Sequence, residues 1–205
     1  MINDAIIRNL RDKLNFSESS IEKLHVFHKD LLNYNQKYNL ISKSTENDVW
    51  NRHILDSAQL VKFINFTEEK SLADLGTGGG FPGLVLAIYN SNEKFHVKLY
   101  EKSNVKCDFL RKMIEKLNVK AEVINEKVGS FQIDSDYIIC RAFKKFSNLL
   151  NISREIGKKP HKLIVLKGKS AQDEINIALK EQKFEYSLEK SMTDINSKII
   201  IISTK

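Results

Sequence analysis

Asp74-Leu75-Gly76-Thr77-Gly78-Gly79-Gly80-Phe81-Pro82-Gly83 is the stretch that decides how this chain folds. Leu72-Ala73-Asp74-Leu75 ends a predicted strand, and Leu84 to Ile88 begin an apolar helix. Glycines in the turn between them let the backbone approach a ligand closely, and the first amides of the following helix can face that ligand. The stretch therefore predicts a cofactor-binding turn between a strand and a helix.

The spacing of the glycines narrows the kind of cofactor. They fall at Gly76, Gly78 and Gly80, whereas a dinucleotide fingerprint would place glycine or alanine where Phe81 stands. An NAD-dependent dehydrogenase is therefore disfavoured. The alternative to cofactor binding is a turn whose glycines only allow the helix to pack tightly against the strand.

Short apolar runs alternate with helical patterns after residue 70. The clearest helix runs from Val105 to Leu117, and alternation of this kind predicts a parallel sheet with helices on both sides. The last two predicted strands have no helix between them, which indicates an antiparallel hairpin. This α/β arrangement resembles the seven-stranded, mostly parallel, Rossmann-like sheet of class I S-adenosylmethionine-dependent methyltransferases. The predicted strands are Ser71–Asp74, His96–Tyr100, Ala121–Ile124, Asp136–Cys140, Lys162–Leu166, Phe184–Leu188 and Lys198–Ser203.

The first seventy residues have a different pattern, which is helical throughout. No Gly or Pro occurs between Met1 and Lys70, and a second amphipathic stretch follows Ser44-Thr45-Glu46. We expect an N-terminal helical extension, residues 1–70, packed on a methyltransferase domain, residues 71–205. The first clear helix follows a Ser17/Ser19 start signal and has Ile21, Leu24, Phe27, Leu31 and Tyr34 at helical spacing.

Composition indicates the compartment and the kind of partner of the protein more than its activity. Lys and Arg number 33 against 26 Asp and Glu, a net charge of +7, which suits either an anionic partner such as nucleic acid or a solvated basic surface. Two cysteines, Cys107 and Cys140, are too few for a disulfide framework and lack metal-ligand spacing. The chain shows no signal peptide and no membrane-length apolar run. We expect a cytoplasmic protein without a bound metal.

Glu101 closes the second predicted strand, Val97-Lys98-Leu99-Tyr100-Glu101. A carboxylate at this place can accept hydrogen bonds from both ribose hydroxyls of an adenosine. The alternatives are a surface ion pair with Lys102 or a cap for the helix that starts near Asn104.

Basic residues gather at the ends of the fourth and fifth predicted strands. Ligands of open parallel sheets bind outside the carboxyl ends of the strands, where cations can neutralise nucleic-acid phosphates. Arg141 and Lys167 directly follow apolar strands and should point into the crevice; we favour a function for Arg141 and leave Lys167 open. Each of the other lysines alone could be an ordinary solvated side chain. The cations are Arg141, Lys144, Lys145, Lys167 and Lys169.

Five motifs together resemble the RsmG/GidB family of bacterial guanine-N7 methyltransferases that act on 16S ribosomal RNA. The resemblance covers nearly the whole chain, and the glycine loop with Phe81-Pro82-Gly83 and the Arg52–Ser57 segment are its most specific parts. The motifs are Asn39-Leu40-Ile41-Ser42, Arg52-His53-Ile54-Leu55-Asp56-Ser57, Asp74 to Gly83, Lys106 to Leu110, and Arg141-Ala142-Phe143.

The resemblance implies S-adenosylmethionine as cofactor, held by Gly76, Gly78, Gly80, Phe81, Glu101, Val128, Gly129 and Arg141. The family usually has Ala-Glu where this chain has Val128-Gly129, so an acidic side-chain contact near the adenine would be missing and only a backbone contact could survive.

The resemblance also implies that the helix with Arg52, His53 and Asp56 lies beside the methyl-transfer site, without assigning their roles. From the residues alone, Arg52 and Asp56 would form a helical ion pair and His53 would be a partly buried histidine. Arg141, His53, Asp56 and Arg52 are thus the catalytic candidates, and Arg52 joins the lysines as a candidate RNA contact.

The chemistry implied needs no general base, because guanine N7 has an in-plane lone pair and no proton. The residues after the fourth strand, Cys140-Arg141-Ala142-Phe143, lack the Asn/Asp-Pro-Pro-aromatic motif of exocyclic amine methylation. A covalent cysteine mechanism at Cys140 is the alternative, but Ile139 stands where proline is typical, and we expect a small buried residue.

The expected partner is 16S ribosomal RNA or an assembling small ribosomal subunit, without a membrane, and the expected state is a monomer. Two other classes of function stay open at this point. One is methylation of another RNA, a protein or a small molecule on the same fold. The other is a non-catalytic module that binds RNA or nucleotide.

Overall fold

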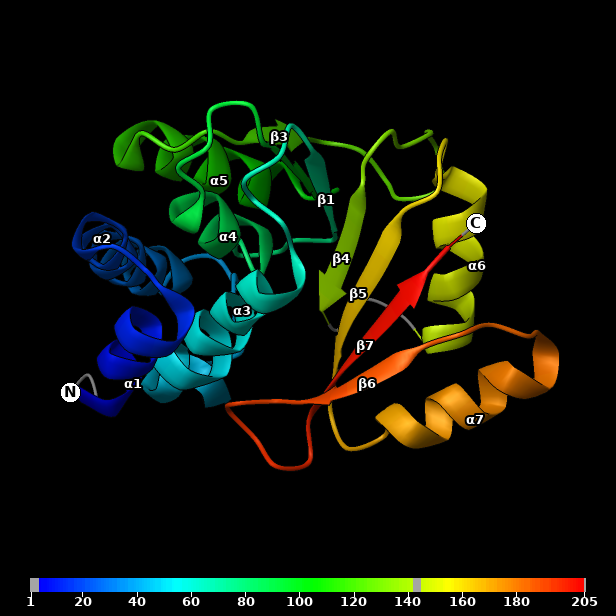
Figure 1. Ribbon diagram of the computed structural model, residues 1–205. Coiled ribbons are helices and arrows are strands. Elements are labelled where there is room, and N and C mark those ends of the chain that lie inside the picture. The colour runs from blue at the N-terminus through cyan, green and yellow to red at the C-terminus, as the bar shows by residue number, and fades with distance from the viewer. Residues whose placement is uncertain (1–3, 142–144, 205) are drawn as a thin grey trace.

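The structure is a computed structural model that describes residues 4–141 and 145–204. Its centre is a seven-stranded sheet with the order β3-β2-β1-β4-β5-β7-β6 (Figure 1). The first five strands pair in parallel, and β7 pairs antiparallel with both β5 and β6. The strands are β1 (Ser71–Leu75), β2 (His96–Tyr100), β3 (Glu122–Ile124), β4 (Tyr137–Arg141), β5 (Lys162–Lys167), β6 (Ser187–Lys190) and β7 (Lys198–Ser203).

Helices cover both faces of the sheet, because the side chains of each central strand alternate between two apolar cores. Leu72, Leu99 and Ile164 face the helices of the N-terminal extension and also α4 and α5. Ala73, Ile138 and Val165 face α6 and α7, on the other side in Figure 1. The predicted doubly covered α/β fold is confirmed. The helices that follow the strands are α4 (Gly83–Tyr89), α5 (Asn104–Leu117), α6 (Phe146–Ile156) and α7 (Ala171–Glu181).

Strand bounds agree with the sequence-based expectation to within one residue except at β6. The prediction began this strand at Phe184, but pairing with β7 begins at Ser187, opposite Ile201. Phe184 instead packs its ring edge-on against Phe146 of α6, with 5.9 Å between ring centroids. Tertiary packing of one aromatic ring therefore delays the strand by three residues.

The first long helix, α2 (Glu18–Asn35), begins where the sequence indicated. The Ser17 hydroxyl accepts a hydrogen bond from the Ser20 amide at 3.1 Å, which is a standard N-cap. The Ser20 hydroxyl in turn donates to the carbonyl of Ile88 in α4 at 2.9 Å. The cap thus also fixes the start of α2 on the helix that follows the glycine loop.

The rest of the extension is helical but mostly not α-helical. The predicted second amphipathic helix is a chain of short turns in which the Asp56 amide reaches the carbonyls of both Asn51 and His53. This wide turn presents residues 52, 53 and 56 together at the end of the sheet. The elements are α1 (Asp4–Arg8), a π-helical turn (Asn9–Lys13), a 3-10 turn (Lys43–Asp48), a π-helical turn (Trp50–Leu55), α3 (Asp56–Ala58) and a 3-10 turn (Gln59–Phe63).

The extension shares one continuous core with the sheet domain. Phe27 of α2 is fully buried, and its ring lies 5.2 Å from that of Phe81 and 6.3 Å from that of Phe109, measured between centroids. Buried side chains run without interruption from α2 through α4 to β1 and β2. Within the described residues, no helix combines the length and apolarity needed to cross a bilayer.

Because of this shared core, we expect the two parts to unfold together. Phe27→Ala should lower the free energy of unfolding by about 3–5 kcal/mol, since it leaves a cavity between both parts, and unfolding should stay a single transition. Urea titration followed by circular dichroism measures both quantities. Val26→Ala, which changes a partly exposed neighbour, is the control; two separate transitions, or equal losses in both variants, would contradict the shared core.

Candidate functional site

The glycine loop after β1 adopts a backbone that only glycine accepts readily. Gly76, Gly78 and Gly80 have φ angles of 71°, 61° and 101°. A Cβ built on Gly78 would meet only the Gly76 carbonyl oxygen, at 3.9 Å, whereas one on Gly80 would press against Leu84 at 3.0 Å. The loop therefore packs its last glycine on the core and leaves the Gly78 side open to a ligand.

The amides at the start of α4 are not available to a ligand, contrary to the expectation from sequence. The Gly83 amide donates to Asp74 Oδ2 at 2.7 Å, and the amides of Gly80 and Phe81 donate to the Thr77 carbonyl. Pro82 has no amide hydrogen. A loop that binds phosphate needs such amides free, so this turn suits a cofactor without phosphate groups.

Asp74 ties the end of β1 to the start of α4. Its carboxyl is fully buried, and this burial raises its pKa to about 6, although the hydrogen bond from the Gly83 amide opposes the rise. A Cβ at Gly83 would lie 2.7 Å from Asp74 Oδ2, so glycine is needed there for close approach. The carboxyl therefore has a structural role in shaping the loop.

Glu101 lies beside the open side of the glycine loop, as expected. Its Oε2 accepts from the Gly78 amide at 3.0 Å and its Oε1 from the Ser103 amide at 2.9 Å, and the residue is only 8% exposed. Gly129, in the turn after β3, has φ 102° and nothing within 4 Å of a built Cβ. A fixed carboxylate between two open glycine turns fits the ribose and adenine of S-adenosylmethionine.

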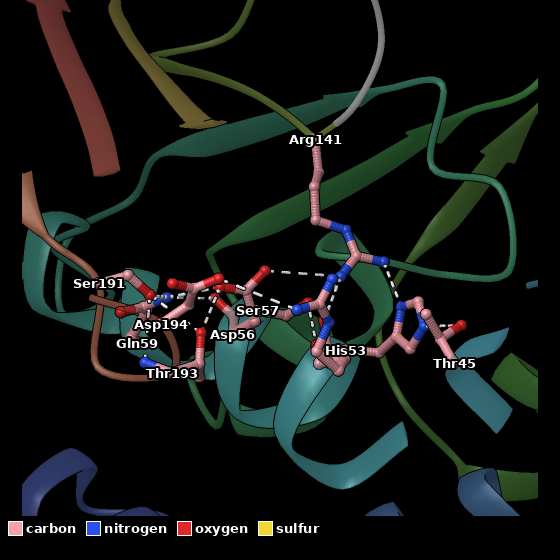
Figure 2. Close-up of polar contacts among 10 residues, drawn as sticks. Thr45, His53, Asp56, Ser57, Gln59, Arg141, Ser191, Thr193 and Asp194 are labelled. Atoms are coloured by element: carbon pink, nitrogen blue, oxygen red, sulfur yellow. Dashed lines mark hydrogen bonds and ion pairs between the residues drawn. The ribbon is translucent and has the colours of Figure 1, made fainter. Parts of the chain in front are cut away.

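Arg141, at the end of β4, is the centre of the polar site (Figure 2). Nη1 donates to the Arg52 carbonyl at 2.9 Å and lies 3.6 Å from Asp56 Oδ2, while Nη2 contacts His53 Nδ1 at 2.7 Å. The guanidinium also lies over the Phe81 ring, 5.1 Å from its centroid. The structure thus pairs Asp56 with Arg141, and the helical Arg52–Asp56 pair considered from sequence is replaced by a 3.9 Å contact from Arg52 to Asp194.

His53 is held as a neutral imidazole of defined tautomer. A guanidinium can only donate, so Nδ1 accepts from Arg141 and Nε2 carries the hydrogen that it donates to Thr45 Oγ1 at 2.8 Å. The Thr45 hydroxyl in turn donates to the Ser42 carbonyl at 2.9 Å. Burial, and then the charges of Arg141 and Arg52, lower the pKa of His53 to about 3.

The loop between β6 and β7 completes the site, which the sequence did not reveal. Thr193 Oγ1 donates to Asp56 Oδ1 at 3.0 Å, and Gln59 Nε2 donates to the same oxygen at 2.9 Å. Gln59 also accepts from the Met192 amide at 2.8 Å. More than 130 residues separate Thr193 from Asp56 and Met192 from Gln59 in the sequence, so local spacing could not predict these two contacts.

A cavity of about 310 Å³ opens beside Arg141, at the carboxyl ends of β4 and β5. Three predicted cations, Arg52, Arg141 and Lys167, line it, together with His53 and Asp56. The glycine loop reaches the cavity through Phe81, which contacts His53 and Arg141. The full lining is Thr45, Arg52, His53, Asp56, Arg141, Leu166, Lys167, Gly168, Thr193, Asp194 and Ser197.

The predicted lysines differ in their surroundings. Lys167 lines the cavity, but its ammonium pairs with Glu174 at 2.7 Å and its side chain is 11% exposed. Lys145 and Lys169 are exposed and are not part of the cavity lining, and Lys144 lies outside the described residues. Arg52, with its side chain 54% exposed, lies both on the cavity and in reach of solvent.

Cys140 is a buried core residue, as expected. It is fully buried among side chains of the α6 face, and burial raises the pKa of its thiol well above the ordinary value. A covalent mechanism through this thiol therefore has no access to a substrate in the cavity. In the part of the chain that the structure describes, no group of His, Cys, Asp and Glu side chains has the arrangement of a metal site.

The 3-2-1-4-5-7-6 sheet, the open glycine turn and Glu101 define a class I S-adenosylmethionine-dependent methyltransferase. Solved structures of this class have the same fold. An S-adenosylmethionine-dependent methyltransferase from Aquifex aeolicus aligns with 73% of this chain and 89% of its own, at a TM-score of 0.57 and 17% identity. A ribosomal protein L11 methylase from Lactobacillus delbrueckii subsp. bulgaricus covers 78% and 79%, at a TM-score of 0.58 and 13% identity.

The chain belongs to the GidB family, rRNA small subunit methyltransferase G, whose model matches residues 20–201. The ribosomal RNA small subunit methyltransferase G of Rickettsia akari is 36% identical over 187 residues, 91% of this chain and 95% of the relative. The protein of the same name from Rickettsia prowazekii is 37% identical over 183 residues, 89% and 93%. The family resemblance inferred from the motifs is confirmed.

The buried neutral state of His53 predicts a measurable dependence of stability on pH. Because the pKa of His53 is about 3 in the folded chain and 6.5 ordinarily, the unfolded chain binds a proton that the folded chain excludes, and stability should be lost as pH falls from about 7 to 4. In His53→Gln this part of the pH dependence should disappear. Urea titrations of both proteins across that range measure the difference.

Two-bond ¹H–¹⁵N NMR gives an independent check on the same assignment. The His53 ring should show the hydrogen on Nε2 and no titration between about pH 8 and 5. An imidazole that titrates near its ordinary value would contradict it.

Proposed function

We propose that this protein transfers the methyl group of S-adenosylmethionine to N7 of one guanosine in 16S, small-subunit ribosomal RNA. The observation that carries the proposal is the family match across residues 20–201, with relatives over nine tenths of the chain named ribosomal RNA small subunit methyltransferase G. The cavity at the ends of β4 and β5, joined to the glycine loop by Phe81, supports a base placed next to the cofactor.

The cofactor would lie along the carboxyl ends of β1, β2 and β3. Glu101 would accept the ribose hydroxyls, since its carboxylate is already fixed by the Gly78 and Ser103 amides. Gly129 would leave room for the adenine. The other proposed contacts are Gly76, Gly78, Gly80, Phe81, Val128 and Arg141.

S-Adenosylmethionine supplies an electrophilic methyl group on a positively charged sulfur. The guanine N7 lone pair would take up this methyl group, and the electron pair of the broken C–S bond would stay on sulfur. No proton leaves N7 in this step, so no general base is required. This agrees with a His53 whose two ring nitrogens are both engaged, by Arg141 and by Thr45.

The chain's own contribution is therefore positioning and charge balance. Methyl transfer moves one positive charge from sulfur to the guanine ring. Asp56 holds the nearby Arg141 cation, which limits repulsion of that charge. Phe81, beneath the guanidinium, would fix the side of the cavity nearest the methyl group.

Basic residues around the cavity would hold the RNA backbone. Arg52 is well placed, being both on the cavity and exposed, and Lys145 and Lys169 are exposed cations that follow β4 and β5 in the chain. Lys144 and Lys167 complete the proposed set, with the Lys167 charge partly offset by Glu174. We further propose that the protein acts as a cytoplasmic monomer on the free RNA or on an assembling subunit.

Glu101→Gln should weaken S-adenosylmethionine binding about 10- to 100-fold, because a charge-assisted hydrogen bond to the ribose is worth about 1.5–3 kcal/mol. Isothermal titration calorimetry measures this affinity. Glu122→Gln, a change of an exposed carboxylate on β3, should leave it unchanged. Equal affinities for Glu101→Gln and the unaltered protein would remove Glu101 from the site.

The reaction itself is tested with purified protein, labelled S-adenosylmethionine and small-subunit RNA from cells that lack the modification. Mass spectrometry should place the methyl group on N7 of a single guanosine, in free RNA or in isolated subunits. RNA affinity should fall steeply with salt, as phosphate contacts require. A methyl group on another atom would falsify the proposal, and an absence of S-adenosylmethionine binding would favour a non-catalytic RNA-binding module.

A further inference from the structure

Asp194 is an acidic side chain in a cavity that must accept an anionic polymer. It belongs to the loop between β6 and β7 and lines the cavity together with Arg52 and Arg141. Its side chain is 35% exposed. A carboxylate here repels RNA phosphates, so its presence calls for a compensating favourable contact.

The two carboxylates of the cavity differ in how many hydrogen bonds and ion pairs they make within the protein. Asp56 Oδ1 already accepts from Gln59 and Thr193, and its Oδ2 lies beside Arg141. Asp194 uses Oδ1 to accept from the Asn196 amide at 2.8 Å, which forms the loop's turn. Its Oδ2 is 3.9 Å from Arg52 Nη1, beyond hydrogen-bond distance. One oxygen of Asp194 thus shapes the loop, and the second lies near an exposed cation on the cavity wall.

Figure 2 shows Asp194 and His53 on opposite sides of the site, and the His53 ring contacts Phe81 of the glycine loop. The glycine loop follows β1, and Asp194 precedes β7; the sheet order places β4 and β5 between these two strands. Within the sheet, β1 and β7 are therefore three strand spacings of about 4.8 Å apart. The Asp194 side is held in place, because Thr193 donates to Asp56 (Figure 2) and the Met192 amide donates to Gln59.

Guanine has a shape that matches this arrangement. N7 lies on one side of the purine, and the N1–H and 2-amino donors lie on the opposite edge. When N7 faces the cofactor at the glycine loop, the two donors face the β7 side. Adenine instead presents an N1 acceptor on that edge, which a carboxylate repels.

We propose that Asp194 reads the target base, accepting hydrogen bonds from guanine N1–H and the 2-amino group while N7 faces the methyl donor. Asp194 is then a specificity-determining residue, and Arg52, released from it, turns to the RNA backbone. This inference rests on the proposed guanosine methylation.

The test combines a change in the protein with a change in the base. Asp194→Asn keeps the turn, because its amide oxygen can still accept from Asn196, but it places an N–H₂ group against the donors of guanine. Inosine keeps N7 and N1–H and lacks the 2-amino group. Each protein is assayed on small-subunit RNA with guanosine or inosine at the mapped position, and kcat/KM is measured.

The unaltered protein should prefer guanosine over inosine about tenfold or more, as expected for a lost hydrogen bond to a charged acceptor. Asp194→Asn should lower kcat/KM on guanosine RNA by a similar or larger factor, and its preference for guanosine should fall to about one. Asp12→Asn, which makes the same charge change on an exposed residue of the N-terminal extension, should behave like the unaltered protein.

Equal rates of the unaltered protein on both RNAs, or an unchanged preference in Asp194→Asn, would overturn the role of Asp194 and leave guanosine methylation intact. No methylation of guanosine RNA by the unaltered protein would instead reject the proposed function. Circular dichroism and S-adenosylmethionine affinity verify that the variant is folded. If it is not, Asp194→Ser, whose hydroxyl can accept the same turn hydrogen bond, decides the question by the same comparison.

Discussion

The guanidinium of Arg141 is the interaction on which the site depends. It is a cation at the end of a buried strand, and burial lowers its pKa while Asp56 and Asp74 oppose that change. A charge in this position is tolerated only with partners on several sides. Asp56, the Arg52 carbonyl, His53 and the Phe81 ring supply them, and in doing so they join the N-terminal extension to the glycine loop.

The three segments around Arg141 constrain one another. The wide turn at residues 50–55 positions His53 and the adjoining Asp56. Phe27 of α2 packs against the Phe81 ring. Thr193 of the β6–β7 loop donates a hydrogen bond to Asp56. In Figure 1 this loop reaches from the sheet toward the N-terminal helices. The extension is therefore part of the wall of the site, and the terminal hairpin is more than a feature that identifies the fold class.

The sequence predicted what depends on local pattern. Strand and helix periodicity located the sheet, the serine signal located the start of α2, the glycine motif located the turn after β1, and the end of the second strand placed Glu101 beside that turn. It could not predict that Asp74 would take up the Gly83 amide, that Phe184 would pack before β6 begins, or that Thr193 and Asp194 would meet the helix of Asp56. The contacts of Phe184, Thr193 and Asp194 join segments that only the folded sheet brings together. The Asp74–Gly83 hydrogen bond is local, but it depends on the backbone path of the loop, which residue spacing does not specify.

Because the loop amides form hydrogen bonds within the loop, they also affect which ligands the cofactor turn can bind. The amides of Gly80, Phe81 and Gly83 donate to Thr77 and Asp74, so these three amides offer no hydrogen bond to a phosphate. Nucleotides such as ATP share the adenosine of S-adenosylmethionine, yet their charged tails gain no partner from these amides and meet the carboxylate of Glu101 close by. In a cell rich in nucleoside phosphates, this turn therefore favours S-adenosylmethionine partly because these amides are already bonded within the loop and cannot bind phosphate.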